Sequence, residues 1–512
     1  MTKQAKAIMV QGTSSNVGKS ILVAALCRIF KQDGYSVAPY KSQNMALNAF
    51  VTKEGGEMGR AQVVQAEAAG IDPSVHMNPI LLKPEADARS QVVVLGKVQT
   101  TVKAKEYYKL TDDLLKIAMD SLVKLRNEYD VVVIEGAGSP AEINLSKHEI
   151  ANMRIAREAA APVLLVGDID RGGVYASCYG TVQLLSKEDR KYIKGYVINK
   201  LRGDGSLLAP ANKILEKKTH IPIIGVVPYF KNITIAQEDS VYLDNPQEES
   251  AKCDLDVVIV RLPHISNYDD FDPIKAFGGA LRYVQKVSEL GNPHIIILPG
   301  SKNTFADLKW LKDNGLFNVI QIKNSQGTVI IGICGGYQIM GKTLSDPLGI
   351  EKDPEDQTNW TQEDSGLGIL DSHTIFADEK RTCQTTAQTI QNRSILDNMA
   401  GIKLSGYEIH MGRTTVEGSC AFNLCTQGGK ACVVHDGALN KEGNAFGTYL
   451  HGIFDSSEFT SILLNNVRKY YGLPQRYDMT GVNKNAEYNK LADIVRQNVD
   501  MAKIYEILNK GL

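Results

Sequence analysis

The chain has 512 residues, 43% of them hydrophobic and 22% charged, and its formal net charge at pH 7 is −1. This length exceeds one ordinary core, so we expect two domains of about 200 residues and a tail. The balanced charge, without a basic stripe, argues against nucleic acid as a partner. No apolar run approaches the roughly 20 residues that span a bilayer, and the first residues leave no room for a signal peptide. We therefore expect a cytoplasmic protein with no membrane partner.

Short apolar runs alternate with amphipathic stretches through the first half of the chain. Each run is typical of a buried parallel strand, and helical periodicity lies between several of them, as over residues 21–30. This alternation predicts a doubly wound α/β domain over residues 1–235. Its predicted strands are 7–10, 131–134, 163–166, 195–198 and 223–227.

A glycine-containing loop joins the first predicted strand to the first helix. Its sequence is Gly12-Thr13-Ser14-Ser15-Asn16-Val17-Gly18-Lys19-Ser20. Backbone N–H groups of such a loop bind phosphate oxygens, the lysine balances phosphate charge, and the final serine binds magnesium. The strict pattern has glycine where Thr13 stands, so the loop is a variant. The residues predicted to bind ATP here are Gly12, Thr13, Asn16, Val17, Gly18, Lys19 and Ser20.

Two charged residues after other strands fit the same site. Glu135 directly follows the strand 131–134, where it would be a second oxygen ligand for magnesium beside Ser20. A solvated acid at a strand end is the alternative. Lys41 follows residues 37–40 and could reach a transferred phosphoryl group, or else be a surface lysine.

Polar residues also follow the later strands, at the edge of the sheet where open α/β folds bind ligands. Asp168, Asp170 and Arg171 come after the strand 163–166. We assign Asp168 to magnesium and the other two to a substrate carboxylate, with ion pairs that stabilise the loop as the alternative. Asn199 and Lys200, after the strand 195–198, are predicted to face the nucleotide base.

Residues 236–252 are polar and acidic without periodicity, which predicts a linker. A second α/β series then begins, with predicted strands at 255–260, 295–298, 329–331 and 445–450, and we assign residues 253–458 to a second doubly wound domain. Helical patterns predominate after it, so residues 459–512 are predicted to form a helical tail.

A single cysteine lies where the apolar strand 329–331 ends. Cys334 is followed by Gly335 and Gly336, which suits the sharp strand-to-helix turn of a nucleophile elbow. A buried core thiol is the alternative, but bulkier neighbours would suit that role. His451, also at a strand end, is the predicted base, and backbone N–H groups at Gly300 and Gly335 are the predicted oxyanion donors.

This second domain resembles class I glutamine amidotransferases, which use a Cys-His-Glu triad. That class has glutamate two residues after the histidine, whereas Ile453 stands there in this chain. The site is therefore a dyad, or its third member comes from elsewhere. The candidates that the sequence offers are Glu408, Glu442 and Asp455.

A cluster of further cysteines invites comparison with a zinc site. Cys420, Cys425, Cys432 and His435 lie close in sequence, but their spacings match no CxxC-type pair. We interpret these thiols as small buried hydrophobic residues rather than metal ligands.

The first loop resembles that of dethiobiotin-synthetase-like enzymes, which phosphorylate a carboxylate, and Ser14 replaces the additional lysine of partition-type ATPases. The chain as a whole, to about residue 460, resembles the cobyric acid synthase family. Besides the two catalytic motifs, the resemblance rests on residues 41–48, 59–62, 78–84, 168–173, 199–204, 298–302 and 406–412.

The resemblance implies amidation of the b, d, e and g carboxylates of adenosylcobyrinic acid a,c-diamide, with ATP, Mg²⁺ and glutamine as the ammonia donor. Two alternatives stay open at this point. One is a related ligase, such as cobyrinic acid a,c-diamide synthase or a cell-wall amidotransferase. The other is a non-enzymatic P-loop switch ATPase, which Ser14 and the Cys334/His451 pair disfavour. The partners implied are a corrinoid and glutamine, while the oligomeric state is left open.

Overall fold

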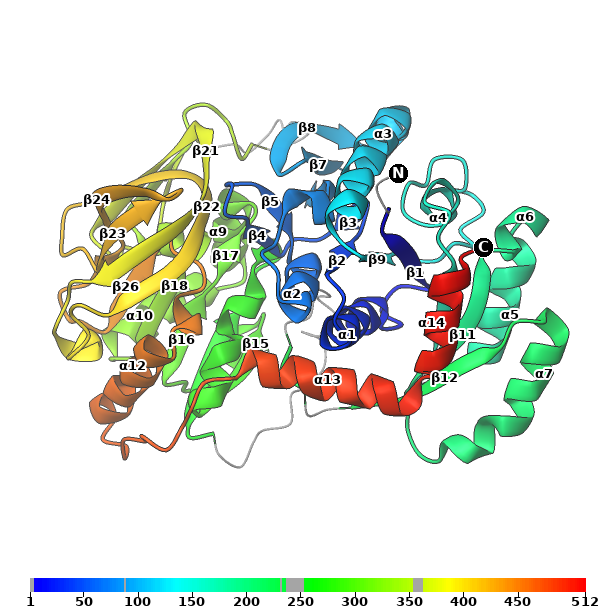
Figure 1. The fold of residues 1–512 in the computed structure, drawn as a ribbon. Helices are drawn as coiled ribbons and strands as arrows, with labels where there is room; N and C mark the ends of the chain where they lie inside the picture. The colour runs from blue at the N-terminus through cyan, green and yellow to red at the C-terminus, as the bar shows by residue number, and fades with distance from the viewer. Residues whose placement is uncertain (1–3, 87–88, 231–232, 236–252, 353–361) are drawn as a thin grey trace.

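The computed structural model describes residues 4–86, 89–230, 233–235, 253–352 and 362–512. Figure 1 shows two α/β bodies side by side, with the N-terminal half in blue to teal and the C-terminal half in green to orange. The predicted linker 236–252 lies outside the described residues. In the described part of the chain, no helix is both long and apolar enough to cross a membrane.

The N-terminal body is built on a parallel six-stranded sheet with the strand order β12-β11-β10-β1-β9-β2. All five predicted strands are confirmed, and the structure adds β2, which ends one residue before Lys41. The strands are β1 (Lys6–Gly12), β2 (Val37–Tyr40), β9 (Val131–Glu135), β10 (Val163–Asp168), β11 (Ile193–Leu201) and β12 (Ile223–Pro228).

Helices cover both faces of this sheet, as the sequence predicts. Ile8 and Val10 of β1 belong to the core shared with α1, whereas Ala7 and Met9 point to the opposite core beneath α3. The apolar runs are continuous because a parallel strand is buried on both faces. The helices are α1 (Lys19–Gln32), α2 (Arg60–Ala69), α3 (Ala104–Glu128), α4 (Met153–Glu158), α5 (Val174–Leu184), α6 (Lys187–Arg190) and α7 (Ala209–Thr219).

Smaller β elements lie between β2 and α3, where the sequence predicts no strand. One sheet has the order β3-β6-β7-β8, and a separate hairpin pairs β4 with β5. In Figure 1 the hairpin lies on the side of this body that meets the C-terminal body. The strands are β3 (Gln43–Met45), β4 (Ala49–Val51), β5 (Glu57–Gly59), β6 (Ile80–Ala86), β7 (Arg89–Val94) and β8 (Lys97–Lys103).

The C-terminal body has its own sheet with the order β15-β13-β16-β18-β26-β25, in which only the edge strand β25 is antiparallel. All four predicted strands are confirmed. The elements of this layer are β13 (Leu255–Val260), β14 (Ile265–Ser266), η4 (Tyr268–Phe277), β15 (Gly279–Val284), α8 (Val287–Leu290), β16 (Ile295–Leu298), β17 (Gly300–Ser301), α9 (Thr304–Asp313), α10 (Leu316–Ser325), β18 (Val329–Ile333), α11 (Gly335–Met340), β25 (Ala438–Leu439) and β26 (Ala445–Thr448).

A second sheet, which the sequence does not predict, follows α11. Two long antiparallel strands, β21 (Ser372–Thr389) and β22 (Lys403–Val416), form its centre. It alternates buried and exposed residues, so it lacks the continuous apolar runs of the parallel sheets. Its other strands are β19 (Thr343–Ser345), β20 (Glu363–Ser365), β23 (Phe422–Gln427) and β24 (Lys430–Asp436).

The tail is helical, as predicted, and it returns to the N-terminal body. Helix α12 (Ser457–Tyr470) packs within the C-terminal body, whereas α13 (Lys484–Asn498) and α14 (Met501–Lys510) belong to the core beside α1 (Figure 1). Arg28 Nε donates to Asn489 Oδ1 at 2.8 Å, and the Asp500 N–H donates to the Ile224 carbonyl at 2.7 Å. The tail therefore completes one face of the first sheet.

Leu491→Ala should destabilise the N-terminal body by about 2–5 kcal/mol, because Leu491 is fully buried in that core and its loss leaves a cavity. Asp493→Ala, an exposed change on the same helix, should stay within about 0.5 kcal/mol of wild type. Urea unfolding of the full chain measures both values. Equal stability of the two variants would contradict the assignment of α13 to the core.

Candidate active sites

The glycine-containing loop connects β1 to α1 in the left-handed conformations that such a turn requires. Asn16 has φ 62° and Gly18 has φ 98°. Lys19 Nζ donates to the carbonyls of Ser14 at 3.0 Å and Gly138 at 3.3 Å, so the lysine lies over the loop. Asn199 Nδ2 donates to the Val17 carbonyl at 2.8 Å and holds the loop from below. A contact between Asn199 and a nucleotide base remains a prediction.

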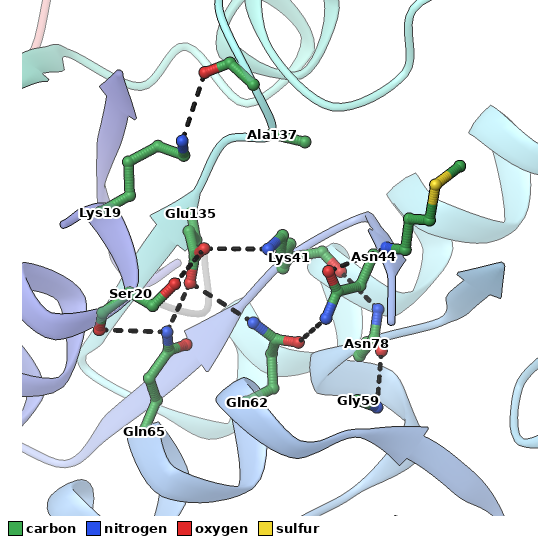
Figure 2. A network of polar contacts seen from close by, with 12 residues as sticks. Lys19, Ser20, Lys41, Asn44, Gly59, Gln62, Gln65, Asn78, Glu135 and Ala137 are labelled. Atoms are coloured by element: carbon green, nitrogen blue, oxygen red, sulfur yellow. Dashed lines mark hydrogen bonds and ion pairs between the residues drawn. The ribbon is translucent and has the colours of Figure 1, made fainter. Parts of the chain in front are cut away.

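Glu135 is the centre of a buried polar network beside this loop (Figure 2). Its Oε1 accepts hydrogen bonds from Ser20 Oγ at 2.8 Å and Lys41 Nζ at 2.9 Å, and its Oε2 accepts from Gln65 Nε2 and Gln62 Nε2. Both Glu135 and Lys41 are buried, so a solvated acid and a surface lysine are the wrong interpretations.

These partners keep Glu135 ionised. Burial alone would raise its pKa, but the charge of Lys41 and the hydrogen bonds from Lys41, Gln65 and Ser20 together lower it. The sequence thus correctly brings Ser20, Lys41 and Glu135 to one place. Gln62 lies in the segment 59–62 that carries the family resemblance, but the sequence predicts no role for it or for Gln65.

The acidic residues after β10 are held by basic neighbours. Asp168 Oδ2 lies 2.9 Å from Lys200 Nζ and 4.0 Å from Arg171 Nε, and Lys200 Nζ also donates to the Asn16 carbonyl of the loop. Asp170 pairs with Arg202 at 2.6 Å. The ion pairs considered as an alternative are therefore present, and the roles of Asp168, Asp170 and Arg171 toward magnesium or substrate remain predictions.

Cys334 lies between β18 and α11 in a strained backbone conformation, with φ 52° and ψ −107°. A Cβ atom on Gly336 would meet the Leu298 carbonyl oxygen at 1.9 Å, and one on Gly335 would meet the Ser301 nitrogen at 2.8 Å. The two glycines thus allow the turn to pack against the end of β16. Although Cys334 is buried, this strain distinguishes it from an ordinary core thiol.

His451 lies beside Cys334 and is fully buried. Its Nδ1 is 2.6 Å from Asp270 Oδ2, and its ring stacks on Tyr407 with centroids 5.1 Å apart. Burial would lower the pKa of His451, but the charge and hydrogen bond of Asp270, together with Cys334, raise it to about 10. A Cβ on Gly300 would meet His451 Cε1 at 3.2 Å, so this predicted oxyanion residue also borders the pair.

Asp270 is therefore the acidic partner of His451 that the sequence could not assign. The three candidates from the sequence for this partner are wrong. Glu408 accepts hydrogen bonds from Thr385, Gln427 and His410, Asp455 pairs with Lys484, and Glu442 is exposed. The sequence feature that could have pointed to Asp270 is the acidic run 269–272 at the start of η4. It lies 181 residues from His451, so no local motif links the two.

The cysteine cluster proves less buried than predicted. Cys425 is exposed, and Cys420 and Cys432 are half-buried, so the interpretation as buried hydrophobic residues is wrong for Cys425. Within the described ranges, no group of three or more His, Cys, Asp or Glu side chains is arranged to hold a metal ion.

Both halves match known domain families. Residues 8–241 match the CobQ/CobB/MinD/ParA nucleotide binding domain, and residues 256–459 match the CobB/CobQ-like glutamine amidotransferase domain. A cobyric acid synthase of Dehalococcoides mccartyi (strain CBDB1) is 57% identical over 510 residues, which cover 99% of this chain and 100% of that protein. The chain belongs to the cobyric acid synthase family.

Other cobyric acid synthases match over the same extent. That of Thermoanaerobacter sp. (strain X514) is 48% identical and covers 98% of this chain and 99% of its own, and that of Clostridium novyi (strain NT) is 46% identical with 99% of each covered. The protein is thus a glutamine-dependent amidotransferase ligase of cobalamin biosynthesis with a nucleotide-binding domain. Membership of this family excludes the alternative that the chain is a non-enzymatic P-loop switch ATPase.

Asp270→Asn should lower the pKa of His451 well below 10, because it removes the carboxylate that stabilises the imidazolium against burial. Glutamine hydrolysis should fall by roughly 10²–10⁴-fold. NMR titration of the labelled His451 ring and a glutamate-release assay measure the two effects. Asp455→Asn is the matched control and should resemble wild type; a larger effect there would restore Asp455 as the partner.

Proposed function

We propose that the chain converts adenosylcobyrinic acid a,c-diamide into adenosylcobyric acid by amidating its b, d, e and g carboxylates with ATP and glutamine. The observation that carries this proposal is the 57% identity to a cobyric acid synthase over essentially the whole chain. The chemistry of the two sites is consistent with it. Asp170, Arg171 and Asn199 are proposed to contact the corrinoid and nucleotide.

A carboxylate must be activated before ammonia can attack it, because oxide or hydroxide is a poor leaving group. Phosphoryl transfer from ATP turns one carboxylate oxygen into a good leaving group, and catalysis of this step depends on positioning and charge neutralisation. Lys19 is placed to balance the charge on the terminal phosphates, while the buried Lys41 is proposed to reach the phosphoryl group in transfer.

The loop also has ligands that suit Mg²⁺. The hydroxyl of Ser20 and the ionised carboxylate of Glu135 meet at 2.8 Å, and hard oxygen donors of this kind fit that cation. We propose that Ser20, Glu135 and Asp168 hold magnesium bound with ATP. When bound, the ion would neutralise negative charge on the phosphates.

At the second site, Cys334 is the proposed nucleophile. His451, whose pKa Asp270 raises against the effect of burial, is proposed to take the thiol proton as the general base. The thiolate adds to the side-chain amide of glutamine, and backbone N–H groups at Gly300 and Gly335 are proposed to stabilise the oxyanion. His451 then protonates the departing nitrogen, which yields ammonia and a glutamyl thioester that water hydrolyses.

Ammonia released at Cys334 must reach the acyl phosphate before it is protonated or lost. We propose that a shielded path runs between the two bodies, since both activities reside in one chain. We also place the protein in the cytoplasm, where the reducing environment keeps a catalytic thiol free.

Incubation with adenosylcobyrinic acid a,c-diamide, ATP, Mg²⁺ and glutamine should add four amides, and mass spectrometry counts them directly. Each amidation replaces OH by NH₂, so the product is about 1 Da lighter per step, and ¹⁵N-labelled glutamine makes each addition unambiguous. Cobyrinic acid is the matched control substrate. Amidation of its a and c carboxylates in place of the other four would identify a diamide synthase and contradict the proposal.

Cys334→Ala should abolish amidation with glutamine and retain amidation with ammonium salts, because only the ammonia source is lost. Lys19→Ala should abolish amidation with either nitrogen donor, since no acyl phosphate forms. The same mass-spectrometric assay reads both variants. Cys425→Ala, at an exposed cysteine, should match wild type. Loss of ammonium-dependent synthesis in Cys334→Ala would contradict the division into two sites.

A further inference from the structure

The N-terminal body reaches directly into the surroundings of His451. Arg60, the first residue of α2, pairs with Asp269 of η4 at 2.7 Å, and both side chains are largely buried. Asp269 is adjacent in sequence to Asp270, which holds His451. An arginine of the nucleotide-binding body thus fixes the segment that orients the proposed base of the other body.

The β4 hairpin makes a second connection to the surroundings of the imidazole. The Ala49 N–H donates to Asn267 Oδ1 at 3.0 Å, and Tyr407 Oη donates to the Ala49 carbonyl at 3.1 Å. Tyr407 stacks on His451, and Asn267 precedes η4. The Arg60 N–H also donates to the Asn48 carbonyl at 3.3 Å, so the hairpin and α2 are held together.

The other side of α2 faces the nucleotide site. Gln62 and Gln65 donate to Glu135, which accepts from Ser20 of the phosphate loop (Figure 2). One helix of ten residues therefore contacts both the proposed magnesium ligand and, through Arg60, the segment that carries Asp270.

We propose that Arg60 is a positioning residue for glutamine hydrolysis, supplied across the domain interface, and that α2 ties the geometry of Asp270 and His451 to the nucleotide site. This inference rests on the proposed roles of Cys334 and His451. Arg60 touches neither glutamine nor the reacting atoms; it acts by holding the start of η4.

The charges around Asp269 give this role a pH signature. Asp269 faces Arg60 from α2, Asp270 and Asp272 from its own turn, and Asp455 from η6 (Ile453–Asp455). Arg60 in turn faces Asp269, Glu67, Tyr407 and Asp455. Burial and the neighbouring carboxylates raise the pKa of Asp269, and the charge of Arg60 counteracts them, so without the guanidinium Asp269 takes up a proton at a higher pH. A protonated Asp269 holds the start of η4, and therefore Asp270, less firmly.

Arg60→Met should lower kcat for glutamine hydrolysis by about 10- to 100-fold through misplacement of the base, with KM for glutamine nearly unchanged. The acid limb of the kcat/KM profile should move to higher pH. If α2 links the two sites, ATP plus the corrinoid acid should stimulate glutamine hydrolysis by the wild type, and this stimulation should disappear in the variant. Ammonium-dependent amidation should persist. Arg60→Lys should restore most of the rate and the profile, and Lys53→Met, which removes an exposed ion pair with Asp72, is the control.

If Arg60→Met keeps the kcat and the pH profile of the unmodified enzyme, the positioning role is overturned. If ATP plus the corrinoid acid does not stimulate glutamine hydrolysis by the unmodified enzyme, the link through α2 is overturned. If Arg60→Met does not fold, the double variant Arg60→Met/Asp269→Asn removes both charges together. It should fold and hydrolyse glutamine slowly; full activity there overturns the proposal. Glutamine hydrolysis by Cys334→Ala would instead contradict the proposed function.

Discussion

The buried carboxylate of Glu135 constrains the arrangement of the whole N-terminal site. An ionised group removed from water is costly unless charged and hydrogen-bonding partners surround it. Here those partners come from three separate segments: Ser20 from the phosphate loop, Lys41 from the end of β2, and Gln62 and Gln65 from α2. Each segment is therefore fixed relative to the others by one acidic side chain. The network orients Ser20, Lys41 and Glu135, the residues for which we propose roles in the phosphoryl chemistry.

Much of this site could be predicted from sequence because its residues follow buried strands. Parallel strands read as continuous apolar runs, and their carboxyl ends meet at one edge of the sheet, so Glu135 and Asp168 could be placed near the phosphate loop. The position of Cys334 could also be predicted, because it follows the buried strand β18 and glycines mark the turn after that strand. The contacts of Gln62 and Gln65 were not, because a glutamine on a helix carries no pattern that distinguishes a buried ligand from a surface residue.

The partner of His451 illustrates the other limit of sequence reasoning. Local motifs reveal residues that share a turn, whereas Asp270 meets His451 only through the packing of η4 against η6, which begins two residues after His451. The sheet formed by β19–β24, in which every pair but β19–β21 is antiparallel, was missed for a related physical reason. Its strands expose one face, so they lack the continuous apolar runs that mark buried parallel strands. The return of α13 and α14 to the first sheet likewise depends on tertiary packing.

A buried carboxylate pairs with a lysine across the interface between the two bodies. Glu57 of β5 is buried between Lys83 of its own body and Lys380 of the other, with Lys380 Nζ at 2.6 Å. Burial lowers the pKa of Lys83 to about 8 despite the attraction of Glu57, and the two lysines together hold the pKa of Glu57 far below its usual range. This ion pair therefore links β5 of the N-terminal body to β21 of the C-terminal body.

The contacts across this interface also constrain the surroundings of His451. Because Arg60 and the β4 hairpin hold the surroundings of His451, their positions and that of the imidazole cannot change independently. The tail adds to this constraint, since α12 packs in one body and α13 and α14 in the other. For the ammonia transfer proposed above, a route through this interface would keep the small neutral intermediate from solvent without an opening of the two bodies.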